Sequence, residues 1–187
     1  MRFALATILL ALAPHVASAA GGREAIPKSW KITIGAAGEP GEPLDLTGHV
    51  VDRSTHAPLA NATVFVYHAD ASGRYNAKDN EGAEPRLCGM LRTNASGEYH
   101  VRTTMPGGYG GFAPHIHFEV SGSGIPRQLL FVNLHLKRPS AGPNPSPAVA
   151  LPGSEPVTRG ADGVLHCSHE LVVESQRRRP LPEPPAR

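Results

Sequence analysis

Two histidines separated by one residue are the side chains in this sequence whose spacing best suits metal binding. His115 and His117 lie among β-branched and aromatic residues, a composition typical of a β-strand. Residues i and i+2 of a strand point to the same face, so the two imidazoles should lie side by side. Imidazole is a common metal ligand, and the glycine-rich turn just upstream can carry the phenol of Tyr109 toward the same strand. A surface His-x-His pair with a turn tyrosine explains the same residues equally well.

The strand that carries this pair is one of several that alternation of apolar and polar residues predicts. The predicted strands are 46–52, 62–68, 87–93, 99–104, the segment from His115, 128–136 and 164–173. The chain has 20 glycines and 19 prolines, many of them between these segments, where they favour turns. The pattern predicts an all-β fold, an antiparallel β-sandwich.

Composition divides the chain into regions. Residues 1–20 combine a positive start, an apolar run and small residues, which is typical of a signal peptide cleaved after Ala19 or Ala20. The expected regions after it are an N-terminal arm at 21–43, the β-sandwich domain at 44–174 with a proline-rich excursion at 138–156, and a disordered tail at 175–187. The mature protein is therefore expected to be exported, to the periplasm or the medium, with no membrane segment after cleavage.

The net charge bears on whether the protein binds nucleic acid, and the cysteine content bears on whether it contains a disulfide. The formal net charge of +2 provides no basic surface of the kind that nucleic-acid binding requires. Cys88 and Cys167 are the only cysteines. A disulfide between them is favoured over two free thiols, because exported proteins seldom keep unpaired cysteines.

Four motifs occur in a fixed order between residues 44 and 136. They are Gly73-Arg74-Tyr75, the hairpin segment Thr93–Tyr99, Pro106-Gly107-Gly108-Tyr109 and Ala113-Pro114-His115-Ile116-His117-Phe118. Together they resemble the intradiol ring-cleavage dioxygenases, the family that includes catechol 1,2-dioxygenase and protocatechuate 3,4-dioxygenase. The joint occurrence of these motifs is far more specific than any one of them, and the resemblance implies the β-sandwich core of that family.

The resemblance implies a non-haem Fe(III) ion bound by Tyr75, Tyr109, His115 and His117. Phenolates are hard anionic ligands suited to ferric iron, and a phenol that ionises near pH 10 needs a strongly charged cation to stay deprotonated at neutral pH. In the family, the tyrosine at the position of Tyr109 is also catalytic: it leaves the iron when a catechol dianion binds and helps take up its proton.

The activity that the resemblance implies is insertion of O2 into a catechol to give a muconate-type diacid. The expected partners are then a small aromatic diol and O2. The bond that is cleaved joins the two hydroxyl-bearing carbons of the ring. Related enzymes commonly assemble, which makes a homo-oligomer possible, but the sequence does not fix the oligomeric state.

Phe112 departs from the family in a way that bears on activity. The family usually has an arginine three residues before the first histidine, where its charge supports a carbanion developing on the substrate. Loss of such a cation can reduce the rate on the order of 10²-fold or more. Arg74, Arg86, Arg92 and Arg127 are candidates to replace the charge. Phe112 also supports an alternative, a non-catalytic β-sandwich that binds ferric iron or catechols, whereas the four retained ligands argue against a metal-free sandwich.

Overall fold

The computed structural model describes residues 27–76, 84–136 and 154–176, which form strands and no helix. The strands are β1 (Lys31–Thr33), β2 (Pro43–Asp52), β3 (Thr63–His68), β4 (Leu87–Arg92), β5 (Glu98–Thr104), β6 (His115–Gly122), β7 (Ile125–Leu136), β8 (Ser154–Arg159), β9 (Leu165–Ser168) and β10 (Leu171–Val173). The prediction of an all-β fold is confirmed. Within these ranges no helix is long and apolar enough to span a membrane.

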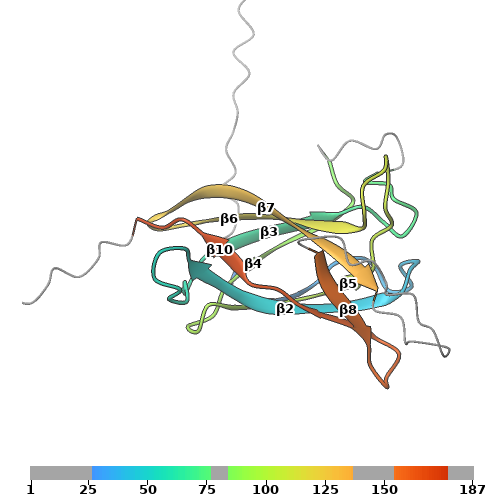
Figure 1. The fold of residues 1–187 in the computed structure, drawn as a ribbon, viewed down its shortest axis with the longest axis horizontal. Coiled ribbons are helices and arrows are strands. Elements are labelled where there is room, and N and C mark those ends of the chain that lie inside the picture. The colour runs from blue at the N-terminus through green and yellow to red at the C-terminus, as the bar shows by residue number, and fades with distance from the viewer. Residues whose placement is uncertain (1–26, 77–83, 137–153, 177–187) are drawn as a thin grey trace, which may run out of the picture.

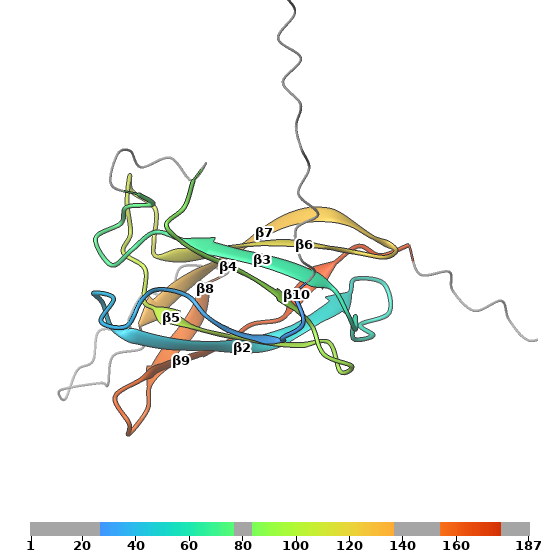
Figure 2. The same cartoon turned by 180° about the vertical axis from the view of Figure 1, so that it is seen from behind.

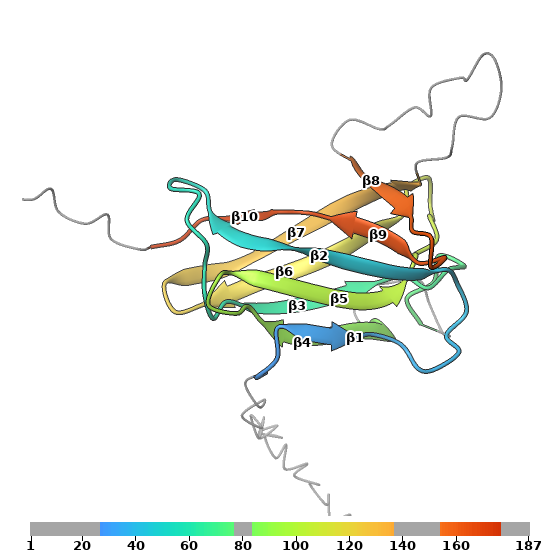
Figure 3. The same ribbon diagram turned by 90° about the horizontal axis from the view of Figure 1, so that it is seen from below.

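The sheet curls over on itself into a flattened barrel. Its strand order is β1-β5-β2-β9-β8-β7-β6-β3-β4, and β10 pairs with β2 off this path. Strands β3, β6 and β7 lie above β2 and β5 in Figure 1, and Figure 2 shows the same two layers from behind. The edge strands β1 and β4 lie side by side in Figure 3. At the end of β4, Arg92 N–H donates a hydrogen bond at 2.9 Å to the backbone oxygen of Ser29, which lies just before β1. The curvature thus brings both open edges of the sheet together.

A purely antiparallel sandwich, the arrangement predicted, does not form. Among the described strands, β1–β5, β2–β9, β2–β10 and β7–β8 pair in parallel. Each of these pairs joins strands that no tight hairpin connects, and a partner that returns by a longer path can run in either direction. Alternation has a period of two residues in both kinds of sheet, so it cannot reveal strand direction.

Alternation does decide which side chains enter the space between the layers. Val64 and Val66 of β3 and Ile116, Phe118 and Val120 of β6 are all 0% exposed. The residues between them therefore point outward, on the face of the upper layer that carries the two histidines. The core fixes the register of β3 against β6, and with it the positions of every outward side chain.

The boundary regions are more structured than their composition indicates. The predicted N-terminal arm contains β1, and its Ile34 is buried in the core. Residues 154–156, at the end of the predicted excursion, begin β8, and the single strand predicted at 164–173 is divided into β9 and β10. Ser175 hydrogen-bonds to Asp52. The predicted signal peptide, the remainder of the excursion and residues 177–187 lie outside the described residues.

The disulfide favoured from the sequence is not formed. Cys88 is an exposed free thiol on β4, whereas Cys167 is a buried free thiol on β9. Alternation turns Cys88 to the outer surface and Cys167 into the core, so the two thiols lie in different environments. Burial raises the pKa of Cys167 to about 12, which keeps this thiol protonated.

Candidate metal centre

Strand β6 places His115 and His117 on one face, as its alternation predicts. The centroids of the two imidazole rings are 4.9 Å apart, and the ring planes are inclined by 72°. Ile116, between them, points into the core and is fully buried. The strand itself therefore brings two nitrogen donors together without any contribution from a loop.

The orientation of His115 follows from one hydrogen bond. Its Nδ1 lies 2.7 Å from Ala113 O. Because a carbonyl oxygen only accepts, Nδ1 carries the proton, and Nε2 is left with a free lone pair. That Nε2 lies 3.2 Å from the phenol oxygen of Tyr109. A backbone carbonyl that fixes the tautomer in this way is the usual support of a metal-binding histidine.

His117 is held by an aromatic neighbour rather than by a hydrogen bond. Its ring stacks on Tyr67, with centroids 4.7 Å apart and planes inclined by 3°. Burial, with a smaller contribution from the charge of His115, lowers the pKa of His117 to about 4. Nδ1 of His117 is buried, and no described residue hydrogen-bonds to it. The imidazole is thus neutral at neutral pH and retains a nitrogen that the described residues leave without a partner.

Asp70 organises the loop that presents Tyr75, and it joins this loop to the one that carries Tyr109. The backbone N–H of Asp70 donates to Arg74 O at 2.8 Å, and its Oδ1 accepts from Arg74 N–H at 3.1 Å. Its backbone oxygen accepts from Gly107 N–H at 2.9 Å. The two tyrosine loops, one after β3 and one after β5, are therefore connected through a single residue.

Two glycines allow these loops to approach each other. A Cβ added at Gly73 would lie 2.6 Å from Gly108 O, and one added at Gly107 would lie 2.5 Å from Ala71 O. Both distances are too short for a real side chain, and Gly73 also has a positive φ of 81°. The glycines of the Gly-Arg-Tyr and Pro-Gly-Gly-Tyr motifs therefore serve the contact between the two loops.

This contact brings the phenols of Tyr75 and Tyr109 together. Their oxygens are 2.9 Å apart, and their rings meet edge to face. Tyr75 is only 2% exposed. Burial raises the pKa of Tyr75, and the hydrogen bond and charge interaction with Tyr109 raise it further. The ring centroid of Tyr75 is also 6.2 Å from that of His117, so both phenols lie against the histidine pair.

Arg86 fixes the backbone of Tyr75 and is itself held by an ion pair with Glu39. Its backbone N–H donates to Tyr75 O at 2.8 Å, and its guanidinium donates to both carboxylate oxygens of Glu39, at 2.7 and 2.8 Å. The hydrogen bond from Arg86 lowers the pKa of Glu39, so this carboxylate is charged at neutral pH. Such a two-point ion pair fixes orientation as well as position.

The donor set suits a ferric ion. Two phenol oxygens and two imidazoles converge, and this mixture of hard oxygen and nitrogen ligands is one that iron accepts. No group of three or more His, Cys, Asp or Glu that could hold a metal occurs among the described residues. Two of the four predicted donors are tyrosines, so the two histidines alone do not make up such a group of three. The contacts of Tyr75 with Tyr109 and of Tyr109 with His115, and the position of His117 beside His115, bring all four predicted ligands together.

A shallow, largely apolar depression opens beside these donors. It has a volume of about 200 Å³ and is lined by Tyr109, Phe112, His115, His117, Phe131 and Asn133. Phe112 is 67% exposed at its rim, with its ring centroid 6.3 Å from that of His115. The size of the depression suits one aromatic ring, and the lining provides aromatic surface for it.

None of the arginines considered as substitutes for the missing charge lines this depression. Arg86 is paired with Glu39, and Arg127 with Glu119. The guanidinium of Arg92 donates to Asn61 O. Among the described residues, no arginine in the wall of the depression therefore replaces the positive charge that the family's arginine would supply at position 112.

Phe131 and Asn133 are two lining residues that the sequence did not reveal. They lie opposite His117 and His115, respectively, in the pairing of β7 with β6. The alternation of residues 128–136 indicates a strand, but only the register of that strand shows which residues face the histidines. Tyr67 is likewise recognisable as a partner of His117 only from the pairing of β3 with β6.

Comparison with known proteins agrees with the motifs. The model of the Dioxygenase family matches residues 23–114. The chain is 32% identical over 114 residues to catechol 1,2-dioxygenase 2 of Acinetobacter lwoffii, a match that covers 51% of this chain and 41% of that one. It is 39% identical over 98 residues to the protocatechuate 3,4-dioxygenase beta chain of Burkholderia cepacia, with 46% and 41% covered. The chain thus spans less than half the length of these curated relatives.

Solved structures share the fold. The dioxygenase domain of a carbohydrate-binding fusion protein from Streptomyces sp. SirexAA-E has a TM-score of 0.58 at 24% identity, with 80% of this chain and 88% of that chain covered. The intradiol ring-cleavage dioxygenase of Tetranychus urticae has a TM-score of 0.55 at 20% identity, with 83% and 90% covered. On the family match and the curated relatives, the chain belongs to the intradiol ring-cleavage dioxygenase family.

Proposed function

We propose that this protein is an exported non-haem Fe(III) intradiol dioxygenase that opens a catechol ring with O2 to give a muconate-type diacid. The observation that carries the proposal is the convergence of four donors from three separate segments. Tyr75 Oη lies 2.9 Å from Tyr109 Oη, which lies 3.2 Å from His115 Nε2. His117 follows on the same strand face.

Tyr75, Tyr109, His115 and His117 would hold the ferric ion in this proposal. When bound, the ion would supply the positive charge that keeps a catecholate ionised and prepares it for reaction with O2. The balance is simple: the carbon–carbon bond between the two hydroxyl-bearing carbons breaks, both oxygen atoms of O2 enter the product, and no further reductant is needed.

Tyr109 is the residue best placed to move a proton. Its oxygen contacts both Tyr75 Oη and His115 Nε2, and its loop is more exposed than the buried Tyr75. In its phenolate form, Tyr109 can accept a proton from an incoming catechol hydroxyl and become a neutral phenol, which is general-base chemistry at hydrogen-bond distance. Phe112 and Phe131, at the wall of the depression, would lie against the substrate ring and exclude water from it.

The test is a visible absorption spectrum of the iron-loaded protein, before and after addition of catechol in air. A tyrosinate-to-iron charge-transfer band is expected, followed by a shift on addition of catechol and by return of the band as one O2 is consumed for each muconate formed. A shifted band that does not return would favour the alternative of catechol binding without turnover, which the absence of a cation at Phe112 supports. A colourless protein with iron verified in the buffer would contradict both.

A further inference from the structure

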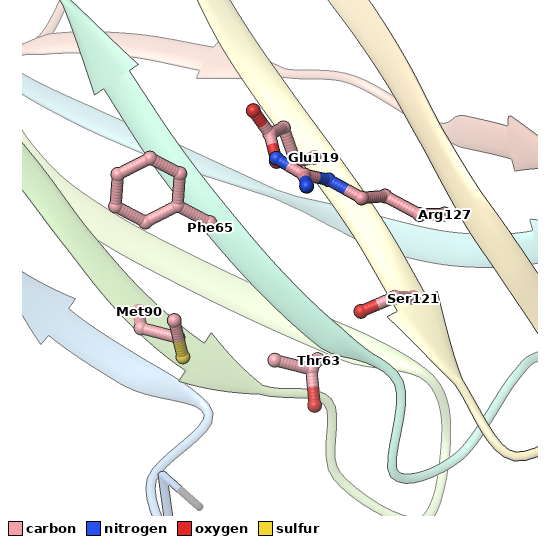
Figure 4. Close-up of a pocket in the computed structure, with 6 residues that line it drawn as sticks. All are labelled: Thr63, Phe65, Met90, Glu119, Ser121 and Arg127. Atoms are coloured by element: carbon pink, nitrogen blue, oxygen red, sulfur yellow. The ribbon is translucent and has the colours of Figure 1, made fainter. Parts of the chain in front are cut away.

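A second depression lies on the same outer sheet face as the candidate metal centre. This distal groove has a volume of about 380 Å³ and is lined by Thr63, Phe65, Met90, Glu119, Ser121 and Arg127, as Figure 4 shows. Glu119 and Ser121 are the next two outward positions of β6 after His117. At a rise of about 3.4 Å per residue, they lie roughly 7 and 14 Å from His117 along the strand. The two depressions are therefore neighbours.

Apolar side chains lie on both sides of the path between the two depressions. On β7, Phe131 lines the first depression and Leu129 is the next outward residue; they are 62% and 60% exposed. On β3, the ring centroid of Phe65 is 5.6 Å from that of Tyr67, the residue that stacks on the candidate ligand His117. A flat apolar group that extends from the metal centre would bury apolar surface against the side chains of β7 on one side and those of β3 on the other.

The side of the distal groove formed by β6 and β7 is polar but electrically balanced. Arg127 reaches from β7 to Glu119 on β6, and its Nε donates to Glu119 Oε2 at 2.7 Å (Figure 4). The two charges compensate each other, and the hydroxyls of Ser121 and Thr63 lie beside them. Hydroxyl groups can donate and accept hydrogen bonds with all of these side chains, whereas a charged ligand end would meet a neutral pair.

We propose that the distal groove is a substrate subsite for the hydroxylated ring system that extends from the catechol ring of a larger, uncharged catechol, whose catechol ring lies at the candidate metal centre. This inference rests on the proposed function. Catechol itself would leave the groove empty, so the groove determines a preference for extended substrates. Catechin, which joins a catechol ring to a hydroxylated, fused two-ring system, is a suitable probe.

The experiment compares catechin with catechol in two independent measurements, kcat/KM for ring opening and Kd by titration calorimetry. Ser121→Trp fills the groove, and Thr47→Trp places the same side chain at an exposed position of β2 in the other layer. We expect Ser121→Trp to reduce the preference for catechin over catechol about tenfold in both measurements, and Thr47→Trp to leave it unchanged. Met90→Ala removes part of the lining instead of filling the groove and is expected to reduce the preference less.

The outcomes separate the subsite from the reaction. An unchanged preference in both Ser121→Trp and Met90→Ala, with catechol still cleaved, would overturn the subsite and leave the proposed function standing. Groove-dependent binding of catechin without ring opening would support the subsite and contradict the reaction. If sedimentation shows a dimer that Ser121→Trp dissociates while the preference for catechin stays constant, a second copy of the chain occupies the groove, and the proposal is wrong.

Discussion

The phenol oxygens of Tyr75 and Tyr109 lie 2.9 Å apart, although 34 residues separate them in the chain. Their loops follow different strands, β3 and β5, and meet at one end of the barrel, where both loops can be followed in Figures 1 and 2. The backbone oxygen of Asp70 and two glycines make this approach possible. Any disturbance of the contact between these loops should therefore affect the metal centre before it affects the core.

Substitution of two proposed ligands tests the metal centre, and substitution of a tyrosine elsewhere in the fold serves as the control. Tyr109→Phe and His117→Ala are each expected to abolish or alter the iron band and to reduce the bound iron, because each removes one donor. Both residues are partly exposed, so the free energy of unfolding should change by only about 1 kcal/mol. Tyr99→Phe is the control, because this phenol is buried and donates to His169 O. Full iron content and colour in both ligand variants would contradict the assignment.

Replacement of the exposed ring at the rim of the depression should increase activity. In Phe112→Arg, the guanidinium would stand beside the substrate ring without being buried, since Phe112 is 67% exposed. A cation there stabilises negative charge on the substrate, and we expect kcat to rise on the order of 10-fold to 100-fold. Oxygen consumption with catechol is the measurement, and Thr47→Arg controls for the added charge. An unchanged rate in Phe112→Arg would mean that the substrate needs no cation at this position.

Two glycines with nearly the same positive φ allow the effect of backbone strain to be distinguished from the effect of the contact between the loops. Gly73 and Gly163 have φ values of 81° and 82°, but only a Cβ at Gly73 would meet another atom within 4 Å. Gly163→Ala should cost about 1 kcal/mol of unfolding free energy through strain alone. Gly73→Ala should cost about 1–3 kcal/mol more and should also reduce bound iron, because it pushes the Tyr109 loop away. Equal effects of the two substitutions on stability and iron content would show that the contact is unimportant.

The two cysteines should differ in their reactivity toward thiol reagents. The native protein should take up one label, at the exposed Cys88, and a second only after unfolding, since Cys167 is buried and its pKa is raised to about 12. Mass spectrometry of the labelled peptides measures this directly. Cys88→Ser should abolish native labelling. A native protein that takes up no label, but takes up two labels after reduction, would reveal a disulfide instead.

The Asp52 carboxylate should contribute a pH-dependent part of the stability. Hydrogen bonds from Ser175, and then from Ser54 and Thr55, hold the pKa of Asp52 well below its usual value of 3.8. A lowered pKa in the folded state stabilises the fold above about pH 4, and this stabilisation is lost as the pH falls toward the folded pKa. Urea unfolding should therefore show a smaller loss of stability between neutral pH and about pH 3 in Asp52→Asn than in the wild type. Parallel curves would contradict this role of Asp52.

Much of this molecule follows from short-range pattern. Alternation with a period of two residues predicts the strands and places His115 and His117 on one face, because the geometry of a single strand decides both. The spacing of the tyrosine motifs likewise indicates which phenols could join the histidines. These features need no knowledge of how the strands pair.

Strand direction and register, by contrast, were decided only in the tertiary structure. The parallel partners of β2, the positions of Phe131 and Asn133 opposite the histidines, and the separation of Cys88 from Cys167 all depend on contacts between segments far apart in the chain. A strand presents the same alternation to a parallel or an antiparallel neighbour, and a shift by two residues preserves its inward and outward faces. Burial of the whole core selects one arrangement among these, and that selection brings the oxygens of Tyr75 and Tyr109 to within hydrogen-bond distance.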